Sequence, residues 1–520
     1  MRKGETVMVN NREADIVIIG GGIAGTAIAR ELSKYNLKTI LVEKNYALAN
    51  GQTKTATASI YAGLVMIGSL IAKSILLKPG EPLYNPDGFK MRWCEEGFRE
   101  WPKVFDELDI KYIRLPVLVF ARNEEELKGL DYYEKVAQEM GEEYVNSYRI
   151  VNKDEIFEIE PNLTKNAIKG LYDDRHLVDA FPPEIAIALA ENAKDNDVEV
   201  ILDAEVKNII KENAHHIVET KQGNIKTNFI INCAGGYADR IAQMGGGSDF
   251  KFNYKTSTLM IYDKNKRNLI NSMVRTPCQP GFLEFVKPTA HGNLIGTSGR
   301  YGTVEGAEDT EIILEDGIQG ANGVSNIIPG ITRKDVINLW RGVRAFGTKE
   351  PDDYLVEFSP FNEKIINIVL RAPGIAGALG LSRHVVEMLT EAGLKLEKKS
   401  NFNPKRRAIP DFSELSDEER NELIKKDPRY GHVICRCETV TEGEIVEAIR
   451  RGAISEQGIK FRTRAGMGRC KRGFCGPRVI EILARELNIP ITEVVKRSYN
   501  SVLIPYKAKE LLLEKEEALI

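Results

Sequence analysis

The sequence predicts an α/β protein in which two domains are interleaved along the chain and a third, small domain follows at the C-terminus. Three observations lead to this expectation. A strand, a glycine-rich turn, a helix and a second strand occupy residues 15–43. After a long mixed stretch, residues 229–233 return to a buried strand, and four of the seven cysteines cluster beyond residue 430.

Length and composition exclude several classes of protein. A chain of 520 residues exceeds what one hydrophobic core usually supports, so we expect two or more domains and room for a large cofactor. The net charge of -3 provides no basic field for nucleic acid, and we expect a small-molecule partner instead. Seven cysteines are too few for a secreted disulfide scaffold, and no signal sequence is recognisable, so a cytoplasmic location is expected.

The first element is a β-α-β unit. Residues 15–19 read as a buried strand, residues 26–35 as a helix and residues 38–43 as a second strand. An apolar run of this kind is typical of a parallel strand that is covered on both faces. We therefore expect a parallel sheet with helices packed against it.

The turn inside this unit carries a dinucleotide-binding motif. Gly20, Gly22 and Gly25 form a Gly-x-Gly-x-x-Gly between strand and helix, which allows a tight turn, close approach to a pyrophosphate and close packing of the two elements. Glu43 ends the second strand, where a carboxylate accepts hydrogen bonds from ribose hydroxyls and disfavours a 2′-phosphate. The motif alone does not separate FAD from NAD.

A second glycine-containing strand end favours FAD. Residues 230–236 run from a buried strand into a turn of small residues that includes Ala234 and Gly235. This arrangement resembles the second flavin-associated strand of FAD enzymes. We therefore expect a Rossmann-like FAD-binding domain interleaved with an α+β substrate domain.

The cysteines near the C-terminus predict a metal site. Cys435 and Cys437 form one pair, and Cys470 and Cys475 form the other. Four thiolates suit a [2Fe-2S] cluster or a structural zinc ion; the Cys-x-Cys pair is unusual for zinc and favours the cluster. Basic residues that would help to neutralise the cluster surround the ligands: Arg436, Arg462, Arg464, Arg469, Lys471 and Arg472.

Composition shifts suggest the domain boundaries. The FAD-dependent oxidoreductase part is expected at residues 1–400, followed by a linker at 401–430, a [2Fe-2S]-binding domain at 431–490 and a tail at 491–520. Within the first part, the expected FAD-binding segments are about residues 1–85, 160–255 and 345–400, and the expected substrate segments are about 86–160 and 256–345.

One charge-free segment has two interpretations. Residues 55–72 approach the length of a bilayer span, although Gly63, Gly68 and several hydroxyls dilute the apolar character. Burial beside the flavin is one interpretation. Peripheral contact with the inner face of a membrane, or with a partner, is the other.

The chain also resembles a known family. Residues 288–293 (Pro-Thr-Ala-His-Gly-Asn) and 341–344 (Arg-Gly-Val-Arg) are similar to segments of the D-amino-acid-oxidase and glycerol-3-phosphate-dehydrogenase superfamily of FAD enzymes. Residues 430–444 and 463–476 resemble the bacterioferritin-associated-ferredoxin-type [2Fe-2S] domain. The combination resembles the large subunit of anaerobic glycerol-3-phosphate dehydrogenases and related dye-linked dehydrogenases.

This resemblance assigns roles to individual residues. It implies that Arg344 holds the anionic group of the substrate and that Gly374 lies near the flavin ring. The family usually has a histidine where this chain has Tyr61, so the usual proton acceptor is absent. Candidate proton handlers are Tyr61, which would need a depressed pKa, and His291, which serves equally well as a structural turn residue.

The expected function is therefore oxidation of a small anionic hydroxy compound, as in glycerol-3-phosphate dehydrogenases, with electrons passing through FAD and a [2Fe-2S] cluster to a partner subunit or quinone. Two alternatives stay open. In one alternative, the substrate is an amino acid such as proline, sarcosine or glycine, or a 2-hydroxyacid. In the other, the chain is an electron-transfer subunit without its own substrate site.

Overall fold

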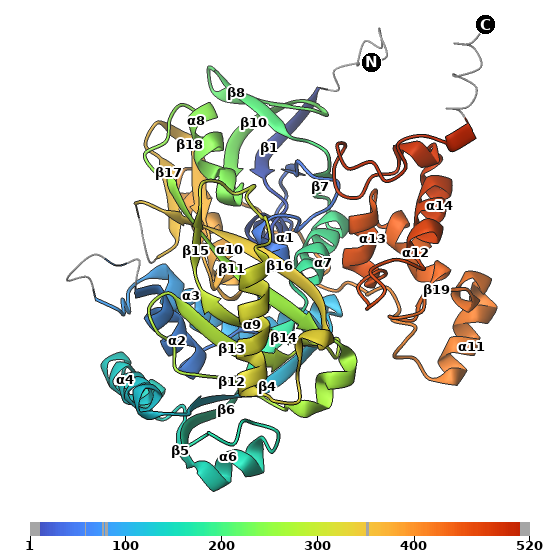
Figure 1. Ribbon diagram of the computed structural model, residues 1–520. Helices are drawn as coiled ribbons and strands as arrows, with labels where there is room; N and C mark the ends of the chain where they lie inside the picture. The colour runs from blue at the N-terminus through green and yellow to red at the C-terminus, as the bar shows by residue number, and fades with distance from the viewer. Residues whose placement is uncertain (1–10, 58, 75–76, 78–81, 350–352, 510–520) are drawn as a thin grey trace, which may run out of the picture.

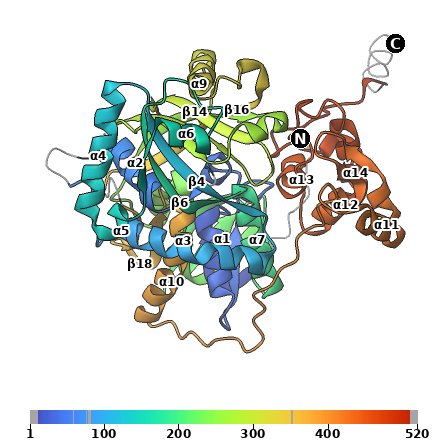
Figure 2. The same ribbon diagram turned by 90° about the horizontal axis from the view of Figure 1, so that it is seen from below.

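The computed structural model of the chain describes residues 11–57, 59–74, 77, 82–349 and 353–509 (Figure 1). Two large sheets are built from segments that alternate along the sequence. The residues beyond about 410 form a separate helical unit, which lies beside the two sheets in both views (Figures 1 and 2). The expected fold class is confirmed.

The first sheet is mostly parallel, with the strand order β17-β18-β10-β1-β2-β7. Its strands are β1 (Arg12–Ile19), β2 (Thr39–Val42), β7 (Glu199–Ile201), β10 (Gly223–Asn232), β17 (Leu355–Ser359) and β18 (Asn362–Val369), and the hairpin β8 (Val206–Glu212) and β9 (His215–Thr220) extends it through β10. The helices that accompany it are α1 (Ile23–Leu32), α7 (Pro182–Asp195), α8 (Ala238–Met244) and α10 (Gly374–Glu391).

Burial on both faces explains why the strands of this sheet are continuously apolar. Ile16 and Ile18 pack into the main core with α1, whereas Val17 and Ile19 pack into a second cluster on the opposite face. The strand and helix expected at residues 15–19 and 26–35 are β1 and α1. The helix begins earlier than expected, because Gly22 already serves as its N-cap.

The second sheet has the order β15-β11-β14-β13-β12-β4-β6-β3, with β16 paired to β11 and β5 paired to β6. Its strands are β3 (Ser59–Ile60), β4 (Tyr112–Ala121), β5 (Arg149–Asn152), β6 (Lys169–Ala180), β11 (Phe252–Tyr262), β12 (Met273–Arg275), β13 (Phe282–Pro288), β14 (Leu294–Arg300), β15 (Gly302–Val304) and β16 (Val336–Gly347). Sheet membership differs from the expected segment boundaries at β3 and β6, which pair here rather than in the first sheet.

Among the described residues, the helices α2 (Gly63–Lys73), α4 (Glu124–Met140), α5 (Glu142–Val145), α6 (Lys153–Ile159) and α9 (Leu314–Ile327) accompany the second sheet. The helix α3 (Phe89–Leu108) packs mainly against α10 of the first sheet. The charge-free segment forms β3 and α2, apart from residue 58, which lies outside the described residues. Leu64, Met66 and Ile67 of α2 are fully buried in the main core, as the burial interpretation requires. Across the described ranges, no helix is long and apolar enough to cross a bilayer.

The C-terminal unit contains β19 (Val433–Cys435), β20 (Val440–Thr441), α12 (Glu442–Arg450), α13 (Glu456–Thr463) and α14 (Gly476–Leu487). The segment expected as a plain linker contains a helix, α11 (Asp417–Lys426), which begins with a capping box at Ser416. Short 3₁₀ turns complete the structure: η1 (Gln52–Thr55), η3 (Gly235–Tyr237), η4 (Lys264–Leu269), η5 (Arg333–Asp335), η6 (Pro428–Gly431) and η7 (Ile491–Glu493).

A buried carboxylate anchors the C-terminal unit to the first sheet. Glu191 of α7 accepts hydrogen bonds from Arg406 at 2.7 Å and from Arg462 of α13 at 3.1 Å, and Arg451 lies 3.7 Å away. Burial alone would raise the pKa of Glu191, but the three guanidinium groups hold this pKa below its usual value. The carboxylate is therefore charged and joins α7 to the C-terminal unit.

Candidate functional site

The turn after β1 is too crowded for any side chain. Gly20 has φ of +116°, and a methyl group there would lie 2.4 Å from the carbonyl oxygen of Cys233. A methyl group on Gly25 would lie 2.0 Å from the carbonyl oxygen of Gly20. The glycines thus allow α1 to start directly behind the strand, so that its N-terminal amides face the sheet edge, where an anion binds favourably.

Glu43 closes the side of this turn. Its Oε2 accepts a hydrogen bond from the amide of Gly21 at 2.8 Å, and its Oε1 accepts hydrogen bonds from the backbone and side-chain amides of Asn45 at 2.9 and 2.7 Å. The side chain is only 8% exposed. A carboxylate fixed in this place is suited to accept further hydrogen bonds from ribose hydroxyls.

Three neighbouring parallel strands carry the predicted cofactor residues. Gly20 follows β1, Ala234 and Gly235 follow β10, and Gly374 begins α10 shortly after β18. Because the carboxyl ends of parallel strands meet at one sheet edge, these residues lie along the same edge. A methyl group on Gly235 would meet nothing within 4 Å, so the space over that turn is open.

The 3₁₀ turn η1 provides a further polar group at this edge. The hydroxyl of Thr53 accepts a hydrogen bond from the amide of Ile23, at the start of α1, at 3.1 Å. The neighbouring Gln52 has a buried side-chain amide nitrogen with no hydrogen-bond partner in the described part of the chain. A buried donor of this kind calls for an acceptor from a ligand. The residues at this edge therefore fit a bound dinucleotide such as FAD.

Arg344 projects from β16 of the second sheet. Its Nη1 donates a hydrogen bond to the hydroxyl of Ser257 on β11 at 2.5 Å. Its guanidinium carbon lies 5.8 Å from the ring centre of Tyr301. Gly342, two residues earlier on β16, packs against Thr55 of η1. The strand that carries Arg344 therefore passes directly beside the candidate cofactor edge.

Tyr61 is not suited to act as a base. It follows β3 and is almost fully buried, and its hydroxyl donates a hydrogen bond to Ser69 at 3.3 Å. Burial raises the pKa of Tyr61 well above the usual value for a phenol, so the hydroxyl stays protonated at neutral pH. The depressed pKa that a proton acceptor requires is therefore contradicted, because burial disfavours the phenolate.

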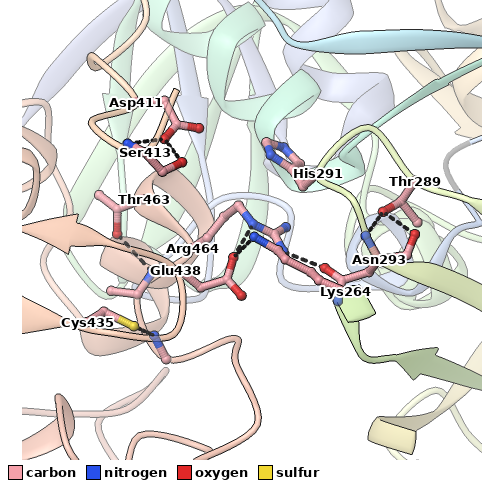
Figure 3. A network of polar contacts seen from close by, with 12 residues as sticks. Lys264, Thr289, His291, Asn293, Asp411, Ser413, Cys435, Glu438, Thr463 and Arg464 are labelled. Atoms are coloured by element: carbon pink, nitrogen blue, oxygen red, sulfur yellow. Dashed lines mark hydrogen bonds and ion pairs between the residues drawn. The ribbon is translucent and has the colours of Figure 1, made fainter. Parts of the chain in front are cut away.

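His291 lies at the contact with the C-terminal unit. Its Nε2 is 3.4 Å from Glu184, and its ring stands edge-on to Phe181 with 6.0 Å between ring centres. Figure 3 shows His291 near Arg464, which belongs to the loop that carries the second cysteine pair. Burial lowers the pKa of His291, so the ring is neutral. This environment favours the structural interpretation of His291.

The four predicted cysteines associate two by two. Cys435 is hydrogen-bonded to Cys475, which lowers the pKa of the Cys435 thiol to about 6, and Cys437 is hydrogen-bonded to Cys470. A methyl group on Gly468 would lie 2.1 Å from the Cβ of Cys437, so this loop requires glycine. Within the described ranges no three His, Cys, Asp or Glu side chains converge as a single metal ion would require. Two pairs of thiols instead fit a cluster of two irons.

Basic residues around the cysteines serve contacts within the chain. Arg464 Nε lies 3.1 Å from Glu438, and its Nη2 donates a hydrogen bond to the side chain of Asn293 at 3.0 Å. Lys264, from the second sheet, lies 3.0 Å from the same carboxylate (Figure 3). Glu438 and Arg464 therefore link the C-terminal unit, which carries the four cysteines, to the Thr289–Asn293 turn.

Two more basic residues of the cysteine loop reach the second sheet. Arg469 forms an ion pair with Asp263 at 2.8 Å, and Lys471 donates a hydrogen bond to Asn338 of β16 at 2.8 Å. The main core also receives Met467 from this loop. These contacts hold the cysteines against the strand that carries Arg344.

The sequence patterns did not single out several residues that the structure brings to the same region. They are Gln52, Tyr133, Ser257, Arg275, Cys278 and Tyr301. The available signal was weak. A cation in the otherwise apolar strand Met273–Arg275 was the clearest clue, because a charge is expensive to bury without a partner.

Comparison with known proteins identifies both cofactors. Residues 15–396 match the family model described as FAD dependent oxidoreductase, and residues 433–485 match the model described as BFD-like [2Fe-2S] binding domain. FAD and a [2Fe-2S] cluster are therefore the cofactors of this chain.

Named relatives cover most of the chain. It is 36% identical over 502 residues to a glycerol 3-phosphate dehydrogenase of Caloramator mitchellensis, covering 94% of this chain and 98% of that one. Identity to the anaerobic glycerol-3-phosphate dehydrogenase subunit A1 of Haloferax volcanii is 23%, covering 91% and 83%. Among solved structures, FAD-bound L-alpha-glycerophosphate oxidase of Mycoplasma pneumoniae aligns with a TM-score of 0.64 and 23% identity, covering 76% of this chain and 99% of that one.

Replacing Gly25 by alanine should abolish FAD binding, because the added methyl group would meet the carbonyl oxygen of Gly20 and push α1 away from the turn. The flavin absorbance per protein of the purified variant measures this. Gly299→Ala is the matched control, since a methyl group there meets nothing within 4 Å. Wild-type flavin content in Gly25→Ala would refute the assignment of this turn to the cofactor.

Proposed function

This chain belongs to the FAD-dependent oxidoreductase family, and we propose that it is a glycerol-3-phosphate dehydrogenase that delivers electrons through its [2Fe-2S] cluster. The observation that carries the proposal is the alignment with the Caloramator mitchellensis enzyme, which spans 94% of this chain and so includes both cofactor domains. Amino-acid and 2-hydroxyacid dehydrogenation have weaker support, because the L-2-hydroxyglutarate dehydrogenase of Indibacter alkaliphilus aligns over only 44% of the chain.

The proposed reaction converts a secondary alcohol into a ketone. A hydride leaves the carbon and a proton leaves the oxygen, so that the substrate loses two electrons in total. FAD, when bound, would supply the acceptor for this electron pair, and a cluster held by Cys435, Cys437, Cys470 and Cys475 would supply one-electron transfer onward. Residues of the chain have to hold the substrate, orient its alcohol and keep water away.

We assign the binding of the phosphate group to Arg344. A guanidinium group presents a planar fork of donors that matches two phosphate oxygens, and Ser257 already fixes one arm of this fork. Burial keeps Tyr61 protonated and its hydroxyl donates a hydrogen bond to Ser69, so we assign Tyr61 as a neutral residue lining the substrate site rather than as a base. Both assignments place neutral or cationic groups around an anionic substrate.

We also propose that electrons leave through the exposed edge of the cluster domain to a partner protein. Cys437 is exposed, whereas Cys435 and Cys475 are buried. Beside them Phe474 is 68% exposed, and the Arg436 guanidinium lies 5.5 Å from the centre of its ring. An exposed aromatic residue with a cation over it is a common feature of transient protein contacts. A membrane-bound partner would bring the chain to the membrane surface.

Anaerobic titration of the FAD-loaded protein tests the substrate. Glycerol 3-phosphate should bleach the flavin absorbance, while L-proline, sarcosine, glycine and L-2-hydroxyglutarate should not, because they lack a phosphate group for Arg344. If one of those compounds bleaches the flavin and glycerol 3-phosphate does not, the chain oxidises that class of substrate instead. If no compound bleaches a fully loaded flavin, the chain is an electron-transfer subunit without its own substrate site.

Replacing Arg344 by lysine should raise KM for glycerol 3-phosphate by roughly 10- to 100-fold, because lysine keeps the charge but loses the two-pronged hydrogen bond. Steady-state kinetics with an artificial acceptor measure the effect. Arg333→Lys, on the exposed turn η5, is the matched control and should behave like the wild type. If KM and kcat for glycerol 3-phosphate are unchanged in Arg344→Lys, Arg344 does not bind the substrate.

Replacing Cys475 by serine should leave flavin reduction by the substrate intact but stop electron delivery beyond the flavin, because one ligand of the cluster is lost. Anaerobic flavin bleaching reports the first step, and the electron paramagnetic resonance signal of the reduced cluster reports the second. Cys94→Ser, at a buried cysteine outside the cluster loop, is the control. Metal analysis that finds zinc and no iron in anaerobically prepared protein would overturn the electron relay.

A further inference from the structure

Arg275 is a buried cation for which the described part of the chain provides no carboxylate partner. It ends strand β12, and only 3% of its surface is exposed. Its Nε has no hydrogen-bond partner, and no aspartate or glutamate in the described ranges forms an ion pair with it. A charge buried in this way is strongly unfavourable unless an anion joins it. The missing partner therefore points to a ligand.

Neutral groups surround this guanidinium. Its Nη2 contacts the sulfur of Cys278, and the backbone amide of Cys278 donates a hydrogen bond to the hydroxyl of Tyr133 at 3.2 Å. Tyr61 and Tyr301 are also close enough to interact with its charge. A methyl group on Gly68 of α2 would lie 2.9 Å from Nη1, so the helix approaches as closely as a glycine permits. The thiol and the phenols raise the pKa of Arg275 against the effect of burial, but none of them is a carboxylate, and each is neutral in its ordinary protonation state.

Tyr301 connects Arg275 to Arg344. Burial raises the pKa of the Tyr301 hydroxyl, and the charges of Arg344 and Arg275 both oppose this rise. Arg344 also stacks near its ring, at 5.8 Å. Arg344 therefore lies over the ring of Tyr301, and Arg275, from another strand of the second sheet, is near enough for its charge to act on the same hydroxyl.

The same cluster extends to the candidate flavin edge. Tyr61 interacts with Tyr354, whose hydroxyl donates a hydrogen bond to the carbonyl oxygen of Pro373 at 2.9 Å. Pro373 directly precedes Gly374 and caps α10. A ligand held beside Arg275 and Arg344 would thus lie next to the sheet edge at which the cofactor residues gather.

We propose that Arg275 and Arg344 together bind a dianionic phosphate monoester, with Arg275 as a second anchoring residue for the substrate. This inference rests on the proposed function and makes it more specific. A phosphate monoester carries close to two negative charges at pH 7, because its second pKa is about 6, whereas a carboxylate carries one. Two guanidinium groups match a dianion, while a carboxylate would leave one of them buried without a partner.

Glycerol 2-phosphate is a suitable probe, because it is a phosphate monoester whose central carbon bears no free hydroxyl to oxidise. Its affinity is measured from the change in flavin absorbance on binding to the FAD-loaded protein. Arg275→Gln should weaken binding by roughly 10- to 100-fold. Arg275→Lys, which keeps the charge, should lose less. Arg267→Gln, at an arginine of η4, is the control and should bind like the wild type.

The pH dependence separates charge recognition from a purely structural effect. In the wild type, affinity for glycerol 2-phosphate should rise by about tenfold between pH 5.0 and pH 7.5, as the probe gains its second charge near pH 6. In Arg275→Gln this rise should largely disappear, and in Arg275→Lys it should persist. Equal weakening at both pH values, or unchanged affinity in Arg275→Gln, would overturn the inference. If Arg275→Gln does not fold, a flat pH profile in Arg275→Lys overturns it instead.

Failure of this inference is distinguishable from failure of the proposed function. If glycerol 3-phosphate bleaches the flavin of the wild type while Arg275→Gln binds the probe normally, only the dianion site is wrong. If the wild type binds the probe through Arg275 but glycerol 3-phosphate leaves the flavin oxidised, the site stands and a different phosphate monoester is the substrate.

Discussion

The parallel pairing of β1 with β10 is the constraint on which the sites of this protein depend. It places the turn after Ile19 so close to the backbone of Cys233 that Gly20 tolerates no side chain, and α1 then starts so tightly behind this turn that Gly25 tolerates none either. Because β18 pairs with β10 in the same direction, the N-terminus of α10 reaches that edge as well. The cofactor site is thus assembled from segments that lie more than 350 residues apart in the sequence.

Ion pairs hold the C-terminal unit against the two large sheets. Glu191 lies among three guanidinium groups, and Glu438 lies between Arg464 of the cluster domain and Lys264 of the second sheet. The sequence analysis expected the basic residues near the cysteines to neutralise the cluster. In the structure, Arg462, Arg464 and Arg469 form ion pairs that bind the C-terminal unit together and to the rest of the chain. Of the four cysteines, Cys437 is exposed and Cys470 half-buried, whereas Cys435 and Cys475 are buried.

The proposed substrate region combines the buried Arg275 and the half-buried Arg344 with neutral tyrosines. Proteins rarely bury a guanidinium without a carboxylate, and this region contains Arg275 in that condition within the described residues. Burial raises the pKa of Tyr61, so its phenol stays protonated near neutral pH and is unsuited to act as a base. The proposed site thus offers two cations for an anion, while its tyrosine is unsuited to act as a base.

The sequence by itself determined the cofactor chemistry. The glycine turn, Glu43 and the two cysteine pairs were all recognisable, because each depends on local geometry: a turn that needs positive φ, a strand end, or closely spaced thiols. Tertiary structure alone decided the rest. It moved β3 and β6 into the second sheet, placed His291 near Arg464 of the C-terminal unit and raised the pKa of Tyr61. It also brought the charges of Arg275 and Arg344 to bear on the same side chain, Tyr301. Burial and long-range strand pairing set these properties, and neither leaves a reliable trace in the neighbouring sequence.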